Sequence, residues 1–181
     1  MKTESTVLYV LRLALTLLAI TAVVAAALAG VNSITKPEID KLTAQKTQDA
    51  IEAVLPGGGE VVDFPATDLV SKVYASETGY AVEVKPGGFD NTITMMVGVD
   101  KAGNVLGIDI ISHTETAGLG AVADAATPAG VSFRQQFVGQ SGSVSVTKDG
   151  GQIDAITGAT ITSRAVCAGV NAALEVVGKM G

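Results

Sequence analysis

The chain has 181 residues, of which 48% are hydrophobic and 4% aromatic, and its formal charge is −6 at pH 7. This length suits one compact domain with appendages, and the acidic balance argues against nucleic acid, which needs a basic face to displace counterions from phosphates. With one cysteine and one histidine, neither a cysteine-based nor a histidine-cluster metal site is expected within the chain, so any redox chemistry would need an organic cofactor or a partner's centre.

Residues 13–31 contain no charged side chain and predict a transmembrane helix. At about 1.5 Å per residue they span roughly 28 Å, which is close to the hydrocarbon thickness of a bilayer. A cleaved signal peptide is the alternative, because Lys2 and Arg12 precede the run and small residues end it. The run is longer than the usual core of about 7 to 15 residues in a signal peptide, which favours a single-pass anchor with residues 1–12 in the cytoplasm. The basic residues on either side do not decide its orientation.

Residues 32–59 predict a connecting helix that leads from the membrane to a soluble domain. Pro37 suits a first helical turn, and Thr35 is placed to cap it. Pro56 and the glycines at 57–59 are expected to end this helix.

From residue 60 onward the pattern changes to short runs with β character separated by turn signals. Pairs of such runs predict antiparallel hairpins, with turns near 77–79, 101–103 and 149–151. The expected strands are 69–76, 79–86, 92–100 and 104–112, and the segment 143–156 is expected to form a further hairpin.

Helices are expected near 120–126, near 132–138 and after residue 162, where Gly178 is expected to end the last one. The last helix places its apolar residues on one face, and Cys167 lies within it as a small core residue. The members of that face are Val166, Val170, Ala173, Leu174 and Val177. The fold class is therefore α+β, with antiparallel hairpins packed against helices and one transmembrane helix before them.

The stretch DAITGATITS, residues 154–163, predicts a turn from a strand into a helix. Unpaired N–H groups and the helix dipole favour an anion at such a start, and Gly158 lets a large group approach the backbone. If Thr162 or Ser163 caps the helix, Thr160 is free for another role. The stretch by itself is compatible with a phosphate site that has Arg164 or Lys148 as counter-charge, and with a cap that binds no ligand.

Two motifs carry a family resemblance. Residues 154–160, DAITGAT, match the flavinylation motif D-x-x-[ST]-G-A-T, and residues 112–120, SHTETAGLG, resemble S-H-x-E-T-P-G-L-G with Ala117 in place of proline. With their order and the N-terminal anchor, the chain resembles the G subunits of Rnf electron-transport complexes. The C subunits of sodium-translocating NADH:quinone reductases share these features, but they are typically longer.

The resemblance implies a covalent FMN, joined by a phosphoester to Thr160 and installed by a flavin transferase. It also implies that residues 112–120 border the isoalloxazine ring. His113 is either a structural group or a flavin neighbour, and Asp154 either is recognised by the transferase or organises its own turn. The cofactor-binding residues expected on this basis are Thr160, Thr157, Gly158, Ala159, Glu115, Thr116, Leu119 and Gly120.

The function implied is that of an electron-transfer subunit without independent catalysis, in an ion-translocating ferredoxin:NAD oxidoreductase that moves sodium or protons. Residues 60–181 would lie on the extracytoplasmic side of the inner membrane, with other proteins of the complex and the lipid bilayer as partners. Three alternatives remain: a standalone flavin reductase or sensor, an anchored solute-binding module, and a hydrolase with Thr160 or Ser163 as nucleophile.

Overall fold

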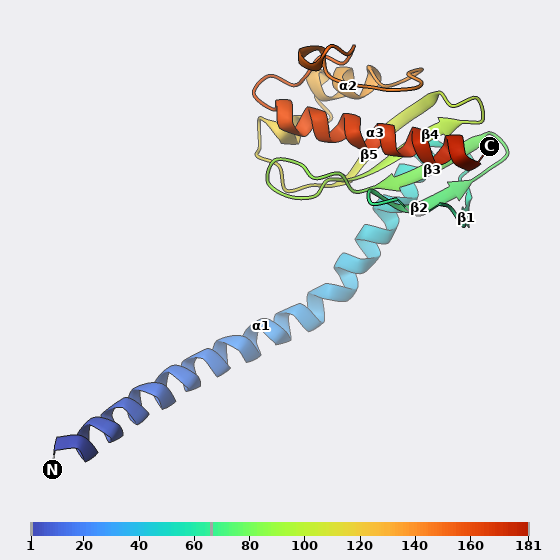
Figure 1. Ribbon diagram of the computed structural model, residues 1–181. Coiled ribbons are helices and arrows are strands. Elements are labelled where there is room, and N and C mark those ends of the chain that lie inside the picture. Colours follow the sequence, from blue (N-terminus) through green and yellow to red (C-terminus); the bar gives the residue numbers. More distant parts are fainter. Residues whose placement is uncertain (1, 66, 181) are drawn as a thin grey trace. The chain divides into compact units, whose positions relative to one another are not determined.

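The computed structural model describes residues 2–65 and 67–180, with side chains from residue 6 onward. The chain divides into two compact units, residues 1–44 and residues 45–181. The helix α1 (Lys2–Val54) opens the chain and contributes its last turns to the second unit (Figure 1).

Among the described residues, α1 is the one helix long and apolar enough to cross a membrane, with a mean hydropathy of 2.4 over its most apolar window. Its two threonines in the apolar run bond back to the helix: Thr16 donates to the carbonyl of Arg12 at 2.8 Å, and Thr21 to that of Leu17 at 3.0 Å. Hydroxyls satisfied in this way cost little in lipid. This segment is suited to anchor the chain in a membrane.

The expectation of a separate helix that begins at Pro37 is wrong, because α1 continues through this proline. Thr35 is not a cap: its hydroxyl donates to the carbonyl of Val31 at 3.0 Å, inside the helix. A proline within a helix loses one backbone hydrogen bond and crowds the preceding turn. This cost is confined to one turn of a helix of 53 residues. The end at 56–59 is as expected, with Gly57 and Gly58 at positive φ.

The second unit contains a five-stranded antiparallel sheet in which each strand pairs with its neighbour in sequence (Figure 1). The four strands and two hairpins predicted between 69 and 112 are confirmed, and a short first strand joins them at the edge. The strands are β1 (Glu60–Val62), β2 (Val70–Ala75), β3 (Gly79–Val84), β4 (Thr94–Asp100) and β5 (Val105–Ser112).

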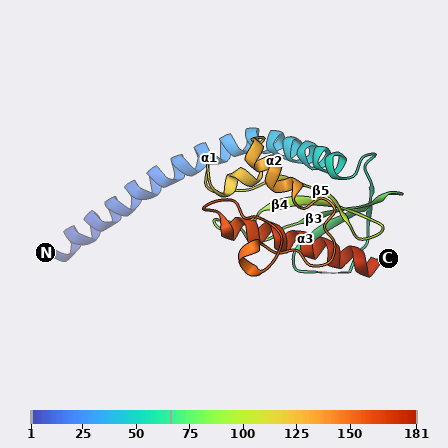
Figure 2. The ribbon, with the colours of Figure 1, turned by 90° about the horizontal axis from the view of Figure 1, so that it is seen from above.

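Both faces of the sheet are covered. The helix α3 (Thr160–Met180) lies along one face, and the last turns of α1 lie on the other (Figure 2). The α3 side holds the larger core, to which Val166, Val170 and Ala173 contribute as predicted. On the opposite face Ile51, Val54 and Leu55 pack against Tyr74, Ala81, Met96 and Ile111.

Helix α3 differs from expectation at both ends. It begins at Thr160 rather than after Thr162, and it continues past Gly178 to Met180. Lys179 forms an ion pair with Glu175 one turn earlier, and such a pair at this spacing contributes a few tenths of a kcal/mol to the last turn. Cys167 is buried in the core as predicted.

Two short helices follow β5: η1 (Gly120–Ala123) and α2 (Pro128–Gln135). The first begins at residue 120 as predicted and ends at Ala123, three residues before the expected end at 126. The second begins four residues before the expected start at 132, because Thr127 and Pro128 form a natural beginning. The hydroxyl of Thr127 accepts the N–H of Gly130 at 3.3 Å, and proline is favoured in the first turn.

The hairpin predicted over 143–156 is wrong. The segment forms the short helix η2 (Thr147–Asp149) and a single parallel bridge between Val146 and Ile153. The backbone of Val144 pairs with a side chain: its N–H donates to Oδ1 of Asn171 at 2.8 Å, and its carbonyl accepts from Nδ2 at 2.8 Å. This amide from α3 supplies the bonds that a partner strand would have given.

Candidate functional site

The two sequence motifs meet at one hollow on the second unit, which we call the Thr160 pocket. It has a volume of about 290 Å³. Six of the eight predicted cofactor-binding residues line it, and Glu115 and Thr157 do not. The lining residues are Phe89, Thr116, Leu119, Gly120, Lys148, Gly158, Ala159, Thr160, Ile161 and Thr162.

The turn before α3 depends on Gly158, whose φ is +77°. This is the left-handed region that glycine adopts without strain. A Cβ at this position would lie 2.9 Å from Cδ2 of Leu119, so the missing side chain also lets the two motifs touch. The N–H of Ala159 closes the turn by donating to the carbonyl of Ile156 at 2.9 Å. Thr160 then begins α3, where the first N–H groups have no partner within the helix.

The expectation that Thr162 or Ser163 caps α3 is wrong, because both lie within the helix. Ser163 Oγ accepts the N–H of Ile156 at 3.0 Å and donates to the carbonyl of Ala159 at 2.9 Å. Thr162 Oγ1 donates to Oε2 of Glu115 at 2.5 Å, and both side chains are buried. Their hydroxyls are thus committed to internal bonds, whereas Thr160 opens on the pocket.

Of the two cations expected near the phosphate, Lys148 is beside Thr160 and Arg164 is committed elsewhere. Lys148 Nζ lies 3.3 Å from Thr160 Oγ1. Arg164 binds Asp149 through two hydrogen bonds of 2.7 Å, from Nε and Nη2. These bonds hold the pKa of the Asp149 carboxyl below its usual range and raise the pKa of Arg164. Lys148 therefore supplies the local positive charge at the threonine oxygen.

Glu115 is buried behind the pocket, with 8% of its surface exposed. Its Oε1 accepts the N–H of Phe89 at 2.8 Å and that of Asp90 at 3.4 Å, while Oε2 accepts the hydroxyl of Thr162. A Cβ on Gly88 or Gly120 would clash with this carboxylate. Glu115 thus connects the segments that form the pocket, but its own side chain does not line the pocket.

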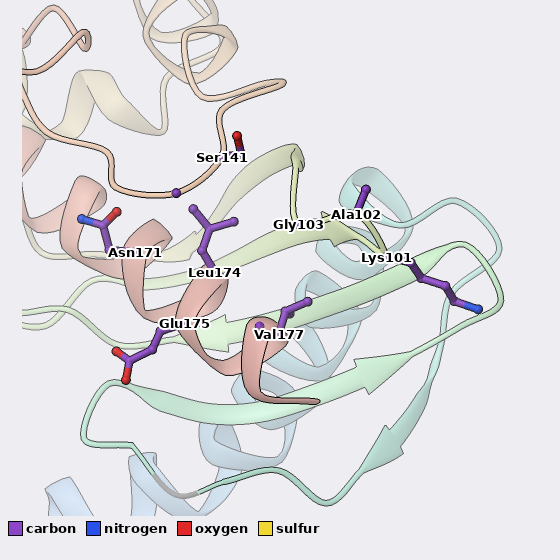
Figure 3. Close-up of a pocket in the computed structure, with 10 residues that line it drawn as sticks. Lys101, Ala102, Gly103, Ser141, Asn171, Leu174, Glu175 and Val177 are labelled. Carbon is purple, nitrogen blue, oxygen red and sulfur yellow. The ribbon is translucent and has the colours of Figure 1, made fainter. Parts of the chain in front are cut away.

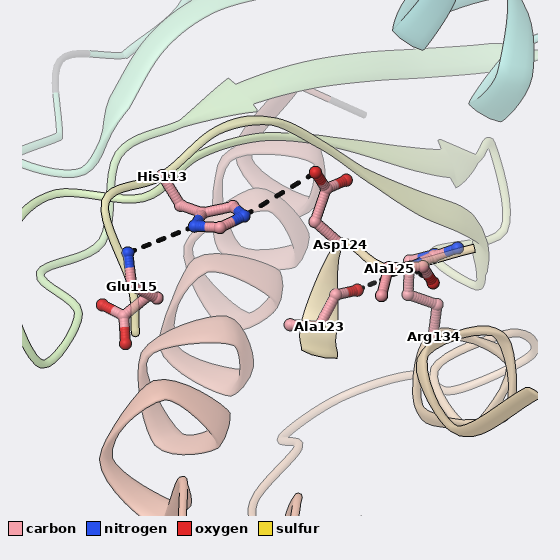
Figure 4. Close-up of polar contacts among 6 residues, drawn as sticks. All are labelled: His113, Glu115, Ala123, Asp124, Ala125 and Arg134. Atoms are coloured by element: carbon pink, nitrogen blue, oxygen red, sulfur yellow. Dashed lines mark hydrogen bonds and ion pairs between the residues drawn. The ribbon is translucent and has the colours of Figure 1, made fainter. Parts of the chain in front are cut away.

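His113 has partners on both ring nitrogens (Figure 4). Its Nδ1 accepts the N–H of Glu115 at 3.2 Å, and its Nε2 lies 3.7 Å from Oδ2 of Asp124. The ring is outside the Thr160 pocket. Of the two roles considered for this residue, these contacts support the structural one.

Further polar contacts around Asp124 involve residues of α2 and β5. In Figure 4, Arg134 reaches from α2 to the end of η1, where its Nη1 donates to the carbonyls of Ala123 at 2.6 Å and Ala125 at 3.3 Å. On β5, burial and the nearby charge of Asp124 raise the pKa of Asp109, against a lowering by Arg134.

Thr157 and Asp154 belong to a neighbouring hollow of about 350 Å³, which Gln136 also lines. The side-chain amide of Gln136 holds the start of the motif: the N–H of Asp154 donates to its Oε1 at 2.7 Å, and its Nε2 donates to the carbonyl of Asp154 at 3.2 Å. Thr157 and Thr160 therefore open on different hollows, although only two residues lie between them.

A third hollow, of about 580 Å³, lies between the β4–β5 turn and the C-terminal half of α3 (Figure 3). Lys101, Ser141, Asn171 and Glu175 are among its lining residues. Neither motif contributes to it. The Thr160 pocket is accordingly the candidate site.

The chemistry of the Thr160 pocket suits a phosphate group that is joined to a planar ring. Lys148 and the start of α3 favour an anion at Thr160. Phe89, Leu119 and Ile161 provide apolar surface for a planar ring. Its volume of about 290 Å³ lies just below the range of about 300–1,000 Å³ for small-molecule pockets, so it encloses only part of a ligand as large as FMN.

Sequence reasoning missed Phe89. No motif marks it, and the one local signal is the preceding glycine pair, which indicates a turn: the N–H of Gly88 donates to the carbonyl of Asn91 at 2.7 Å. Its place beside the pocket depends on the contact with Glu115, 26 residues later in the chain.

Comparison with known proteins identifies relatives of this chain. The FMN-binding domain family matches residues 88–175. The chain is 34% identical to the G subunit of the Na(+)-translocating ferredoxin:NAD(+) oxidoreductase complex of Acetobacterium woodii, over 92% of this chain and 91% of the relative. It is 32% identical to the G subunit of the ion-translocating oxidoreductase complex of Methanosarcina acetivorans, over 90% and 91%. The corresponding protein of Vibrio vulnificus is 42% identical over 55% of this chain and 49% of the relative.

Proposed function

The chain belongs to the G subunits of ion-translocating ferredoxin:NAD oxidoreductase (Rnf) complexes and has their FMN-binding domain, and from this premise we propose that it carries FMN covalently on Thr160. In this proposal residues 13–31 anchor the chain in the inner membrane as a single-pass helix. The FMN domain lies on the extracytoplasmic side. Neighbouring proteins of the complex exchange electrons with it, and a flavin transferase attaches the cofactor.

The choice of Thr160 rests on what each hydroxyl of the motif does. Ser163 and Thr162 are buried and bonded internally, and Thr157 lies at the neighbouring hollow. Thr162 also lines the pocket formed by both motifs, but its hydroxyl is bonded to Glu115, whereas Thr160 lines the same pocket with Lys148 beside its oxygen. This arrangement favours Thr160 as the attachment point.

Bound FMN would supply one- and two-electron redox chemistry, and the protein would supply position and electrostatics. Lys148 and the start of α3 would balance the charge of a phosphodiester at Thr160. Because the pocket encloses only part of such a ligand, a covalent bond keeps the cofactor in place without tight contacts. The exposed remainder would be accessible to a partner's redox centre.

The histidine on which the hydrolase alternative depends lies outside the Thr160 pocket. The ring of His113 is engaged by Glu115 and Asp124, outside the Thr160 pocket. A triad would need a histidine within hydrogen-bond reach of Thr160 or Ser163. The contacts of His113 therefore favour the flavin carrier over a hydrolase.

The test is flavin fluorescence in a denaturing gel. The full chain, expressed with a flavin transferase, is expected to give a fluorescent band that Thr160→Val abolishes. Thr147→Val, at an exposed threonine of η2 outside the motif, should leave the band unchanged. Circular dichroism should show that Thr160→Val remains folded. A dark wild-type band would refute the covalent FMN, and a fluorescent Thr160→Val band would refute the attachment residue.

Membership in a complex predicts co-purification. Solubilisation of native membranes in mild detergent should recover the chain together with other membrane proteins of the complex. Recovery of the flavinylated chain alone, under conditions that keep such complexes intact, would favour a standalone flavin reductase or sensor.

A further inference from the structure

Exposed apolar side chains gather at the Thr160 pocket. Among the described residues of the second unit, seven large hydrophobic side chains are exposed, and three of them line this pocket. Phe89 is 66% exposed, Ile161 49% and Leu119 43%. The other four are Val61, Leu106, Val131 and Val138. Single exposed apolar residues are common, but three around one hollow indicate a surface that something apolar covers.

The backbone of Phe89 is fixed although its ring is exposed. It lies in a tight loop whose ends are joined by a bridge between Gly87 and Thr92, and by a hydrogen bond of 2.9 Å from the N–H of Ile93 to the carbonyl of Pro86. At the tip, the N–H of Phe89 donates to Glu115 Oε1 at 2.8 Å. An exposed ring on a fixed backbone is prepared for a contact and costs little entropy to order.

The anchor of this loop is a buried carboxylate, which is expensive unless its hydrogen bonds are satisfied. Glu115 accepts from Phe89, Asp90 and Thr162, so it joins the loop to the first turn of α3. Gly88 and Gly120 leave room for it, because a Cβ at either position would clash with its oxygens. The position of Phe89 relative to Thr160 thus depends on one side chain.

We propose that Phe89 is the aromatic wall against which the isoalloxazine ring of the FMN on Thr160 packs, and that Glu115 is the positioning residue that holds Phe89 in place. Leu119 and Ile161 complete the apolar surface. Offset packing of planar π systems is favourable beyond the area that it buries. This inference rests on the proposed attachment at Thr160.

The test uses contact quenching in the full flavinylated chain. Tryptophan quenches an excited flavin by electron transfer at van der Waals contact, so Phe89→Trp should lower the native flavin fluorescence severalfold. Val61→Trp, at a site as exposed but outside the pocket, should leave it unchanged. In denaturant all samples should fluoresce equally, which controls for flavin load.

The outcomes separate the two proposals. A wild-type band without gel fluorescence refutes the covalent FMN. A fluorescent band together with an unquenched Phe89→Trp protein refutes the Phe89 wall and leaves the attachment intact.

The role of Glu115 has its own readout. Phe89→Ala should expose the flavin and raise its quenching by iodide about twofold or more. Glu115→Ala should have a similar effect, because the loop loses its anchor. Glu115→Gln keeps an acceptor oxygen for the N–H groups of Phe89 and Asp90, and it should restore the wild-type value. The positioning role would be refuted if Glu115→Ala showed the same iodide quenching as the wild type. It would also be refuted if Glu115→Gln were quenched as strongly as Glu115→Ala.

Discussion

The Nζ atom of Lys148 lies 3.3 Å from Oγ1 of Thr160, and this contact joins the η2 turn to the first residue of α3. Arg164 is held by Asp149 through two bonds of 2.7 Å, so its charge is already compensated. Lys148 therefore has a defined role in the proposal, which is to offset the negative charge that develops when the Thr160 oxygen joins a phosphate.

Reversal of this charge should slow flavin attachment. With limiting transferase, we expect Lys148→Glu to lower the initial rate of covalent flavin incorporation about two- to fivefold, the range of an exposed ion pair. Lys148→Arg should stay near the wild-type rate. The measurement is in-gel flavin fluorescence against time, and added salt should reduce the difference. Lys101→Glu, at the hollow between the β4–β5 turn and α3, is the control, and an equal loss there would point to net charge instead.

The close approach of Leu119 to Gly158 predicts a measurable coupling. Gly158→Ala should destabilise the fold by about 1–3 kcal/mol in urea unfolding, because alanine at positive φ is strained and its Cβ meets Leu119. Gly142→Ala is the matched control: φ is +74° there, but no atom lies within 4 Å of the added Cβ, so about 1 kcal/mol is expected.

A double mutant separates strain from collision at Gly158. Leu119→Ala removes the atom that the new Cβ would meet, so Gly158→Ala should cost less in that background than in the wild type. Equal costs in both backgrounds would show that the two motifs do not touch as described.

The sheet could be predicted because its signals are local. Strands β2 to β5 alternate or run apolar, and turn residues separate them within a few positions. The segment 143–156 has the same local signals but no hairpin, since its backbone partner is the Asn171 side chain, 27 residues away. Pro37 indicated a helix start by a local rule, and the long helix around it overrode that rule.

The candidate site, like the fold, could be predicted from the sequence only in part. Six of the residues predicted from the two motifs line the Thr160 pocket, because each motif is a short local pattern that can be read from the sequence. The roles of Glu115 and Phe89 could not be predicted, since they depend on a contact across 26 residues that no local pattern encodes. Likewise, the hydrogen bonds of the Ser163 hydroxyl with the turn and of the Thr162 hydroxyl with Glu115 form only in the folded chain.

The raised pKa of Asp109 predicts that its charge destabilises the fold at neutral pH. Burial and Asp124 make the folded state hold this proton more tightly than the unfolded chain does. Asp109→Asn should therefore increase the free energy of unfolding at pH 7, and the gain should disappear below the unfolded pKa of about 3.9.

Asp100 provides a control of opposite sign for this pH dependence. The side-chain and backbone hydrogen bonds from Asn104 lower its pKa, so Asp100→Asn should decrease stability at pH 7 and have less effect as the pH falls. Urea unfolding at pH 7 and near pH 4 measures both variants. If both substitutions changed the free energy of unfolding in the same direction at pH 7, the opposite pKa shifts of Asp109 and Asp100 would be contradicted.

Cys167 should be chemically inert in the folded chain. It is 3% exposed on α3, and burial, followed by the charge of Asp149, raises its pKa to about 11. At pH 8 roughly one thiol in a thousand would be ionised at that pKa, and the thiolate is the species that reacts. Alkylation by iodoacetamide, followed by mass spectrometry, should be at least about 100-fold slower in native protein than in urea. Fast native labelling would place the thiol near the surface and contradict its burial in the core.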